Sequence, residues 1–235
     1  MDNSTALVTG ANKGIGQEIA RQLAEAGLTV YLGSRDAARG ENACAEIGGD
    51  TRQLIIDVTD AASIADAASQ VAVLDILVNN AGISAEGRAA GEAGVDEFRR
   101  VYETNVFGVV AVTNAFLPAL RRSRAPRIVN VSSGTGSLTW STGSAYRSYA
   151  GNMAAYRSSK TALNAVTVFY AKALGDPFKV NALAPGLRKT DLNPIAAASG
   201  GDPAEAAAGA VRLALLPGDG PTGQFLSWDG MTVPW

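Results

Sequence analysis

Histidine is absent from this chain of 235 residues, and its absence removes several kinds of chemistry. Without histidine there is no Ser-His-Asp triad, no histidine general base and none of the commonest zinc ligand sets. We therefore expect no bound metal. Any acid–base step must use Tyr, Lys, Asp, Glu or Cys.

Cysteine is almost as scarce. The single Cys44 cannot form an internal disulfide. It lies in a stretch with a helical pattern, where a small buried residue is a simpler explanation than a reactive thiol.

Long apolar runs and a strong charge bias are also missing. No run approaches the roughly 18 apolar residues of a membrane span, and the amino terminus lacks the pattern of a signal peptide. The net charge is -2, and the one basic cluster, Arg121, Arg122, Arg124 and Arg127, lies where cations complement a helix dipole. We expect a soluble, cytoplasmic protein that binds neither membranes nor nucleic acid.

The remaining composition is that of a packed globule, with 47% hydrophobic and 18% charged residues. No fixed-period repeat appears, and no Pro/Gly/Ser-rich linker divides the chain. Because α/β sheets of this size commonly share one core, we expect a single domain over residues 1–235.

Short β-branched runs alternate with longer Ala-rich stretches whose apolar residues recur every three or four positions. The predicted strands cover residues 6–9, 29–33, 52–56, 75–78, 127–131, 179–182 and 223–227. The predicted helices cover residues 16–25, 37–46, 61–70, 95–120, 153–174 and 203–215. This alternation predicts a Rossmann-type, doubly wound α/β domain, with a seven-stranded, mainly parallel sheet and helices on both faces.

Two polar stretches are predicted to be functional loops. Residues 134–151 are rich in Gly, Ser and Thr and carry Trp140, Tyr146 and Tyr149. These aromatic rings either line a substrate pocket or pack against one another. Residues 191–202 are interpreted as a mobile lid over a medium-sized, largely apolar substrate.

A glycine-rich turn follows the first predicted strand and opens directly into a helix. In it Gly10 turns the chain, Gly14 lets the backbone approach a pyrophosphate, and Gly16 allows close packing of helix on strand. The helix N-terminus offers free N–H groups to phosphates. Asn12, Lys13 and Ile15 complete this candidate dinucleotide site.

The second predicted strand ends without the carboxylate that usually binds the ribose hydroxyls of NAD. Ser34 and Arg35 stand there instead. Arg35 by a bidentate contact and Lys13 as a point charge could flank an adenosine 2′-phosphate, which predicts NADP(H) as the cofactor. The alternative is two solvated surface cations.

Tyr156 and Lys160 lie four residues apart in a predicted helix, so both side chains can enter the same cleft. A free phenol has a pKa of roughly 10, and a nearby ammonium favours the phenolate. Tyr156 can then donate a proton to a carbonyl oxygen as hydride reaches the carbon, and accept it in the reverse direction.

In combination these motifs resemble the short-chain dehydrogenase/reductase family over nearly the whole chain. They include Asn79-Asn80-Ala81-Gly82, Ser132-Ser133 and Tyr156-Arg157-Ser158-Ser159-Lys160. The chain is most similar to the carbonyl reductase branch, which uses NADPH. The resemblance implies that Ser133, ranked above Ser132, holds the substrate oxygen. It also implies that Lys160 binds the nicotinamide ribose, and that the backbone carbonyl of Asn105 holds a water that relays protons from Lys160.

Further cofactor contacts follow from the resemblance. Asp57 would contact the adenine, with an N-cap role for the next helix as a rival, and Thr190 would contact the carboxamide or pyrophosphate, or cap a local helix. The other implied cofactor residues are Val58, Asn79, Ala81, Gly82, Pro185 and Gly186.

The predicted function is reversible hydride transfer between NADPH and a ketone or aldehyde, with a small-molecule carbonyl or alcohol as partner. Alternatives are an NADP-binding regulatory domain without catalysis, an alcohol oxidiser, or a reductase of imines or enones. The 22 residues between Ser133 and Tyr156 exceed the length in most family members. A homodimer or homotetramer through the helices of Asn105 and Tyr156 is expected.

Overall fold

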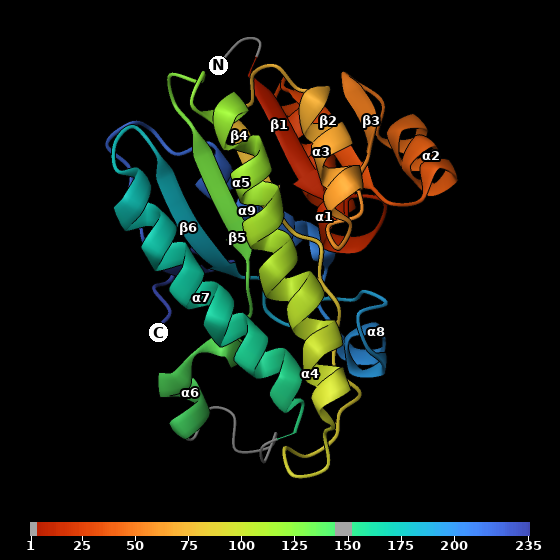
Figure 1. Cartoon of the computed structure of the whole chain (residues 1–235), viewed down its shortest axis with the longest axis vertical. Coiled ribbons are helices and arrows are strands. Elements are labelled where there is room, and N and C mark those ends of the chain that lie inside the picture. Colours follow the sequence, from red (N-terminus) through yellow and green to blue (C-terminus); the bar gives the residue numbers. More distant parts are fainter. Residues whose placement is uncertain (1–3, 144–151) are drawn as a thin grey trace.

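Seven parallel strands form one twisted sheet in the computed structural model, which describes residues 4–143 and 152–235 (Figure 1). Their order is β3-β2-β1-β4-β5-β6-β7, and every neighbouring pair runs parallel. The predicted Rossmann-type architecture is therefore confirmed. The strands are β1 Thr5–Thr9, β2 Thr29–Ser34, β3 Thr51–Ile55, β4 Ile76–Asn79, β5 Arg127–Val131, β6 Lys179–Ala184 and β7 Phe225–Ser227.

Helices cover both faces of this sheet (Figure 1). One layer contains α1 and α9, which pack against each other, and the other contains α3, α5 and α7. The helices are α1 Gly14–Glu25, α2 Ala37–Ile47, α3 Ala61–Ser69, α4 Val95–Tyr102, α5 Gly108–Leu120, α6 Leu138–Thr142, α7 Ala154–Leu174, α8 Pro194–Ser199 and α9 Pro203–Ala214. None in the described part of the chain is long and apolar enough to cross a membrane.

The central strands are apolar on both faces because both faces are covered. In β1, Ala6 and Val8 join the core under α1 and α9, whereas Leu7 joins the core under α3 and α5. β5 alternates in the same way, with Val129 on the first side and Ile128 on the second. Such buried parallel strands read as continuous hydrophobic runs, which is why their positions were predictable.

Two regions differ from the predicted elements. The single helix expected over residues 95–120 is interrupted by a π-helical turn, Glu103–Phe107, between α4 and α5. In this turn the Gly108 amide donates to the Glu103 carbonyl five residues back. Hydrophobic spacing does not record such a shift in hydrogen bonding, and π turns often occur at functional sites.

The loops predicted over residues 134–151 and 191–202 contain short helices, which corrects that interpretation. Ser137 caps α6 by accepting from the Trp140 amide, and Asn193 caps α8 by accepting from the Ala196 amide. Polar residues that signal a loop are also the residues that start helices. Tyr146 and Tyr149 lie outside the described residues, so their predicted role stays a prediction.

Arg127 of the basic cluster and Cys44 both lie in positions where they contribute to packing. Arg127 is buried at the start of β5 and donates to the carbonyls of Pro126, Pro177 and Leu216. Burial lowers the pKa of Arg127. Cys44 is partly buried against the core beneath α1, and burial raises the pKa of its thiol.

A buried amide network joins the centre of the sheet to two helices. The Asn79 side chain in β4 donates to Asn130 in β5 at 2.9 Å and to Thr113 in α5 at 3.1 Å. Asn130 in turn donates to Thr167 in α7 at 2.8 Å. Buried polar groups require such partners, so the network sets how α5 and α7 lie on the sheet.

We expect Asn130→Ala to lower the free energy of unfolding by about 3 kcal/mol, because it leaves one N–H of the Asn79 amide and the Thr167 hydroxyl without their buried partner and opens a small cavity. Urea unfolding measures this loss. Asn114→Ala is the control: its side chain accepts only an exposed hydrogen bond from Tyr170, so a change within about 0.5 kcal/mol is expected. Equal losses in the two variants would contradict the assigned role.

Candidate active site and cofactor cavity

Two cavities meet at the carboxyl ends of the strands. The larger, about 730 Å³, extends from the glycine turn past the ends of β2 and β4 to Lys160. The smaller, about 340 Å³, lies between the N-terminal end of α7, α8 and the end of β7. Among the described residues, six line both cavities: Ile15, Tyr156, Pro185, Thr190, Leu192 and Asn193. A molecule in the first can therefore contact a molecule in the second.

The glycine turn forms one end of the larger cavity. Gly14 has φ +58°, a conformation that L side chains rarely adopt, and a Cβ on Gly16 would collide with the Gly10 carbonyl. The structure brings together all six residues of the predicted dinucleotide site, which line this cavity: Gly10, Asn12, Lys13, Gly14, Ile15 and Gly16. The turn thus brings backbone, rather than side chains, to the place where a phosphate is expected.

Asn80 holds the glycine turn in place and was missing from the predicted contacts. Its amide donates to the carbonyls of Thr9 at 2.9 Å and Gly10 at 3.1 Å. The Thr9 hydroxyl accepts in return from the amides of Asn80 and Ala81. The adjacent Asn79 and Asn80 in the sequence indicated that an asparagine could bind the turn. Which of the two faces the turn depends on the pleat of β4.

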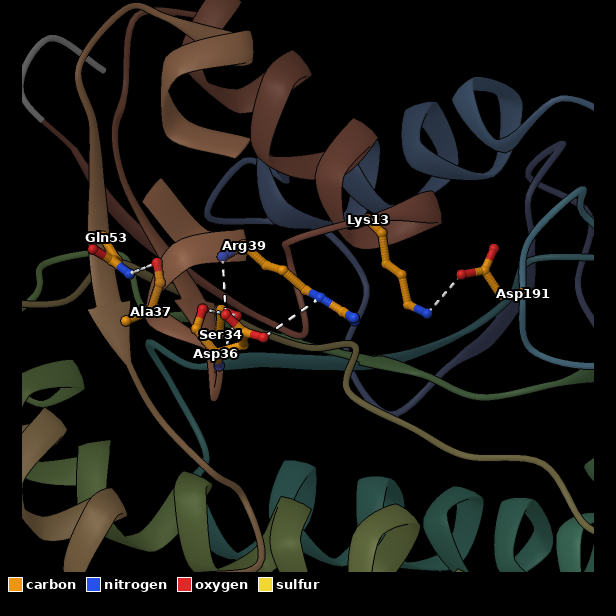
Figure 2. Close-up of polar contacts among 7 residues, drawn as sticks. All are labelled: Lys13, Ser34, Asp36, Ala37, Arg39, Gln53 and Asp191. Atoms are coloured by element: carbon orange, nitrogen blue, oxygen red, sulfur yellow. Dashed lines mark hydrogen bonds and ion pairs between the residues drawn. The ribbon is translucent and has the colours of Figure 1, made fainter. Parts of the chain in front are cut away.

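Arg35 is exposed and lines the larger cavity at the end of β2. The nearest carboxylate in sequence, Asp36, accepts from the Arg39 amide at 3.0 Å and caps α2. The side chain of Ser34 is buried and donates to the Asp36 carbonyl, so it serves the turn rather than the cavity wall. Figure 2 shows Ser34, Asp36 and Arg39 around this turn.

Lys13 and Asp191 both line the larger cavity, and their side chains point toward each other (Figure 2). Its ammonium lies 2.7 Å from the Asp191 carboxylate, and both side chains are more than half exposed. This hydrogen bond, followed by the charges of Lys13 and Arg39, lowers the pKa of Asp191. Lys13 and Arg39 therefore share one electrostatic neighbourhood.

Asp191 and Arg39 were not among the predicted site residues. Arg39 stands in the first turn of α2, where the helix dipole disfavours a cation. A cation at this unfavourable position was the feature of the sequence that could have pointed to Arg39. Asp191 gave none, because only the path of the loop after β6 brings it opposite Lys13.

Asp57 and Val58 line the larger cavity after β3. The Thr59 hydroxyl and amide donate to the Asp57 carboxylate, and these bonds, with the charge of Arg35, lower its pKa. The rival interpretation of Asp57 as an N-cap is wrong, because Asp60 caps α3. Ala81 and Gly82 also line the cavity, whereas Asn79 lies in the buried network.

Tyr156 and Lys160 project from the first half of α7; Tyr156 lines both cavities and Lys160 lines the larger one. The Lys160 ammonium lies 5.8 Å from the centroid of the Tyr156 ring and donates to the Val131 carbonyl at 2.9 Å. Lys160 is only 4% exposed, and burial lowers its pKa to about 8. A nearly dry ammonium beside a phenol is therefore present, as the spacing predicted.

The two serines after β5 face different surroundings. The Ser133 hydroxyl is partly buried, lies 2.8 Å from the Thr135 hydroxyl, and belongs to the wall of the smaller cavity with Tyr156. Ser132 is 2% exposed, and its hydroxyl donates to Asn164 at 2.6 Å. Ser132 lines the larger cavity with its hydroxyl engaged by Asn164, whereas the less buried Ser133 lies beside Tyr156 in the smaller one.

Asn105 lies in the π-helical turn, close to Lys160 but outside both cavity walls. Its side chain accepts from the Ile83 amide and donates to the Ile83 carbonyl and the Ser159 hydroxyl. A Cβ placed on Gly82 would lie 3.3 Å from the Asn105 amide oxygen and 3.6 Å from the Lys160 nitrogen. The side chain of Asn105 is thus committed to holding α4–α5, α7 and the segment after β4 together.

The segment after β6 separates the two cavities. Pro185 and Thr190 line both, and Gly186 lines the smaller one. The suggestion that Thr190 caps a helix is wrong, because Asn193 caps α8. Trp140 belongs to the wall of the smaller cavity, which agrees with the pocket-lining interpretation of that aromatic ring.

Comparison with known proteins identifies the family. The family model for short chain dehydrogenases matches residues 4–198. The chain belongs to the short-chain dehydrogenase family. This short-chain dehydrogenase is 36% identical to (-)-isopiperitenone reductase of Mentha piperita, with 95% of the chain and 96% of that protein covered.

Solved structures of relatives have the same fold. Salutaridine reductase from Papaver somniferum is 30% identical, with a TM-score of 0.81 over 95% of this chain and 99% of that one. NADPH-bound carbonyl reductase from chicken fatty liver is 27% identical, with a TM-score of 0.85 over the whole of both chains. The predicted family and fold are confirmed.

Proposed function

We propose that this short-chain dehydrogenase reduces a ketone or aldehyde to the alcohol with NADPH, and that Tyr156 supplies the proton. The observation that carries this proposal is the position of Tyr156, which lines both cavities, beside the buried ammonium of Lys160. The reductase relatives, including the NADPH-bound carbonyl reductase, support the same assignment.

The larger cavity fits a dinucleotide. It combines a backbone cradle at the glycine turn, the helix N-terminus of α1, and Lys160 at the opposite end. The pyrophosphate would lie on the turn Gly10–Gly16, the adenine near Asp57 and Val58, and the nicotinamide against Pro185 and Thr190. NADPH, when bound, supplies the hydride.

The side chains of this protein would bind and protonate the carbonyl oxygen of the substrate. Ser133 donates a hydrogen bond to the carbonyl oxygen and holds it beside Tyr156. Tyr156 transfers its hydroxyl proton to that oxygen as the carbon is reduced, leaving a phenolate. The Lys160 ammonium favours this anion and returns a proton toward it, and the backbone of Asn105 lies on the relay route to solvent.

The charges near the end of β2 support NADPH rather than NADH. Arg35 and Lys13 line the larger cavity near the expected position of a 2′-phosphate, and Arg39 contributes positive charge nearby. Asp36 is engaged as a helix cap and in an ion pair with Arg39. Asp191 occupies Lys13 in an exposed ion pair, so a phosphate must share or displace it. Exposed ion pairs of this kind contribute little free energy, so replacing Asp191 by a phosphate at Lys13 costs little.

A regulatory domain that binds NADP without catalysis is the second candidate, and alcohol oxidation or reduction of imines or enones is the third. The regulatory domain is disfavoured because the chain carries together the four residues expected for catalysis, Ser133, Tyr156, Lys160 and Asn105. The apolar surroundings of the smaller cavity support a medium-sized apolar substrate. A single domain over residues 1–235, a cytoplasmic location and a homodimer or homotetramer stay predictions.

Tyr156→Phe is expected to lower kcat for carbonyl reduction by about 10²- to 10⁴-fold, because no other proton donor replaces the phenol. NADPH binding, measured by fluorescence titration, should change less than threefold. The control Tyr170→Phe removes a hydroxyl from the far end of the same helix and should keep full activity. Substantial turnover by Tyr156→Phe across a panel of ketones and aldehydes would refute the assignment.

The pH dependence of kcat/KM should reflect Lys160. Because its pKa is about 8, the ammonium is charged below that pH and neutral above it. Carbonyl reduction is therefore expected to be level below about pH 7 and to fall about tenfold per pH unit above pH 8. In Lys160→Arg the residual activity should lose this descent, since a guanidinium does not titrate there. A wild-type profile that stays level to pH 9.5 would contradict the assigned role.

The cofactor preference should follow the cations. We expect kcat/KM with NADPH to exceed that with NADH by tenfold or more, and Arg35→Asp to narrow or reverse the ratio. Asp191→Asn should raise the ratio about two- to fivefold, because it frees Lys13. Arg52→Ala, an exposed arginine paired with Asp50 outside the cavity, is the matched control and should leave the ratio unchanged. Comparable wild-type rates with the two cofactors would refute the prediction.

A further inference from the structure

The smaller cavity has a one-sided charge. Its wall is largely apolar, with Trp140, Leu187, Ile195 and Trp228 among the larger side chains. Within residues 4–143 and 152–235 it contains two arginines, Arg157 and Arg188, and no Asp or Glu. A cavity for a purely apolar ketone has no need of a cation, so these side chains require an explanation.

Arg188 is the more deeply buried of the two, with a side chain 6% exposed. Its Nε donates to the Pro185 carbonyl at 2.7 Å, and its Nη1 donates to the Glu205 carboxylate at 2.6 Å. The centre of the guanidinium lies 4.2 Å from the centroid of the Trp228 ring. Three sides of the group are therefore fixed by the protein.

The fourth side, Nη2, donates no hydrogen bond to any described residue. It lies beside Gly186, since a Cβ on Gly186 would be 3.3 Å from Nη2. Gly186, Arg188 and Trp228 all belong to the cavity wall. The two hydrogens of Nη2 are thus left for an acceptor within the cavity.

The pairing with Glu205 does not meet this need. Glu205 is half exposed, belongs to α9 outside the cavity wall, and contacts Nη1 alone. A guanidinium carries five N–H donors, and the two on Nη2 can donate to the oxygens of a carboxylate. In a cavity lined by apolar side chains such a charge-assisted hydrogen bond is stronger than in water.

We propose that Arg188 selects substrates in which the reacting ketone or aldehyde is joined by an apolar skeleton to a carboxylate. This inference rests on the proposed carbonyl reduction and names the substrate class of the same site. The carbonyl lies at Ser133 and Tyr156, and the carboxylate accepts from Nη2 of Arg188. The apolar walls enclose the skeleton between them.

Arg188 also has a structural task, which the test must separate from binding. Its backbone segment pairs with Gly201, through Gly201 N to the Leu187 carbonyl and Lys189 N to the Gly201 carbonyl. This pairing closes the base of the loop that carries α8. A variant of Arg188 that loosens this loop would impair acids and neutral ketones alike, whereas loss of a carboxylate contact would impair the acids alone.

The experiment compares ω-benzoyl carboxylates with two to four methylene groups, their methyl esters and butyrophenone. Wild type, Arg188→Lys, Arg188→Met and Glu205→Gln are each assayed with NADPH, and binding of the same ketones to the complex with NADP⁺ is measured by calorimetry. No hydride is available in that complex, so binding is read without turnover. Butyrophenone reports on carbonyl reduction itself, independently of the carboxylate.

For wild type we expect kcat/KM and affinity to be at least tenfold higher for the best acid than for its ester. Arg188→Met should bring this ratio to about one, Arg188→Lys should restore part of it, and Glu205→Gln should keep it. Equal values for acid and ester in wild type, or a ratio that survives in Arg188→Met, would overturn the proposal. Reduction of butyrophenone in that case would leave the proposed function standing. Binding of the acids without reduction of any ketone would refute the proposed function instead.

Discussion

The parallel pairing of β1 with β4 is the constraint on which the rest of this structure depends. The strand order reverses there, because β2 and β3 lie on one side of β1 and β4 to β7 lie on the other. At such a reversal the connections leave the sheet in opposite directions and open a crevice at its carboxyl edge. The glycine turn after β1 and the Asn80–Ala81–Gly82 segment after β4 border this crevice, and the hydrogen bonds of Asn80 join them.

Burial of the Lys160 ammonium couples this crevice to the second layer of the fold. The ammonium is shielded from water, and this burial lowers its pKa. It donates a hydrogen bond to the Val131 carbonyl. Its surroundings are supplied by β5, by the segment after β4 and by the π-helical turn that contains Asn105. Three segments distant in sequence therefore converge on one charged group. The π turn is part of this arrangement, because it brings Asn105 between Ile83 and Ser159.

Lys160 on α7 and Arg188 after β6 are two buried cations that lie at different cavities. Lys160 lines the larger cavity beside Tyr156, and Arg188 lines the smaller cavity. A charge is costly to bury without partners, so each is held by a backbone carbonyl. Exposed pairs such as Lys13–Asp191 have a different character: they are weak, and can exchange partners with a ligand at small cost.

The sequence by itself determined the alternation of strands and helices, the glycine turn, the Tyr156–Lys160 spacing and the absence of a carboxylate at the end of β2. Each of these is a local pattern, and local patterns follow from backbone conformation and from the periods of helix and strand. The tertiary structure alone decided that Ser133 lines the smaller cavity and Ser132 the larger one, that Asn79 is buried while Asn80 holds the turn, and that Asp191 meets Lys13. It also decided that Arg188, ordinary in sequence, is buried at the wall of the smaller cavity. These facts depend on residues brought together from separate loops, and the relative positions of loops are set by the packing of the whole sheet rather than by any short stretch of chain.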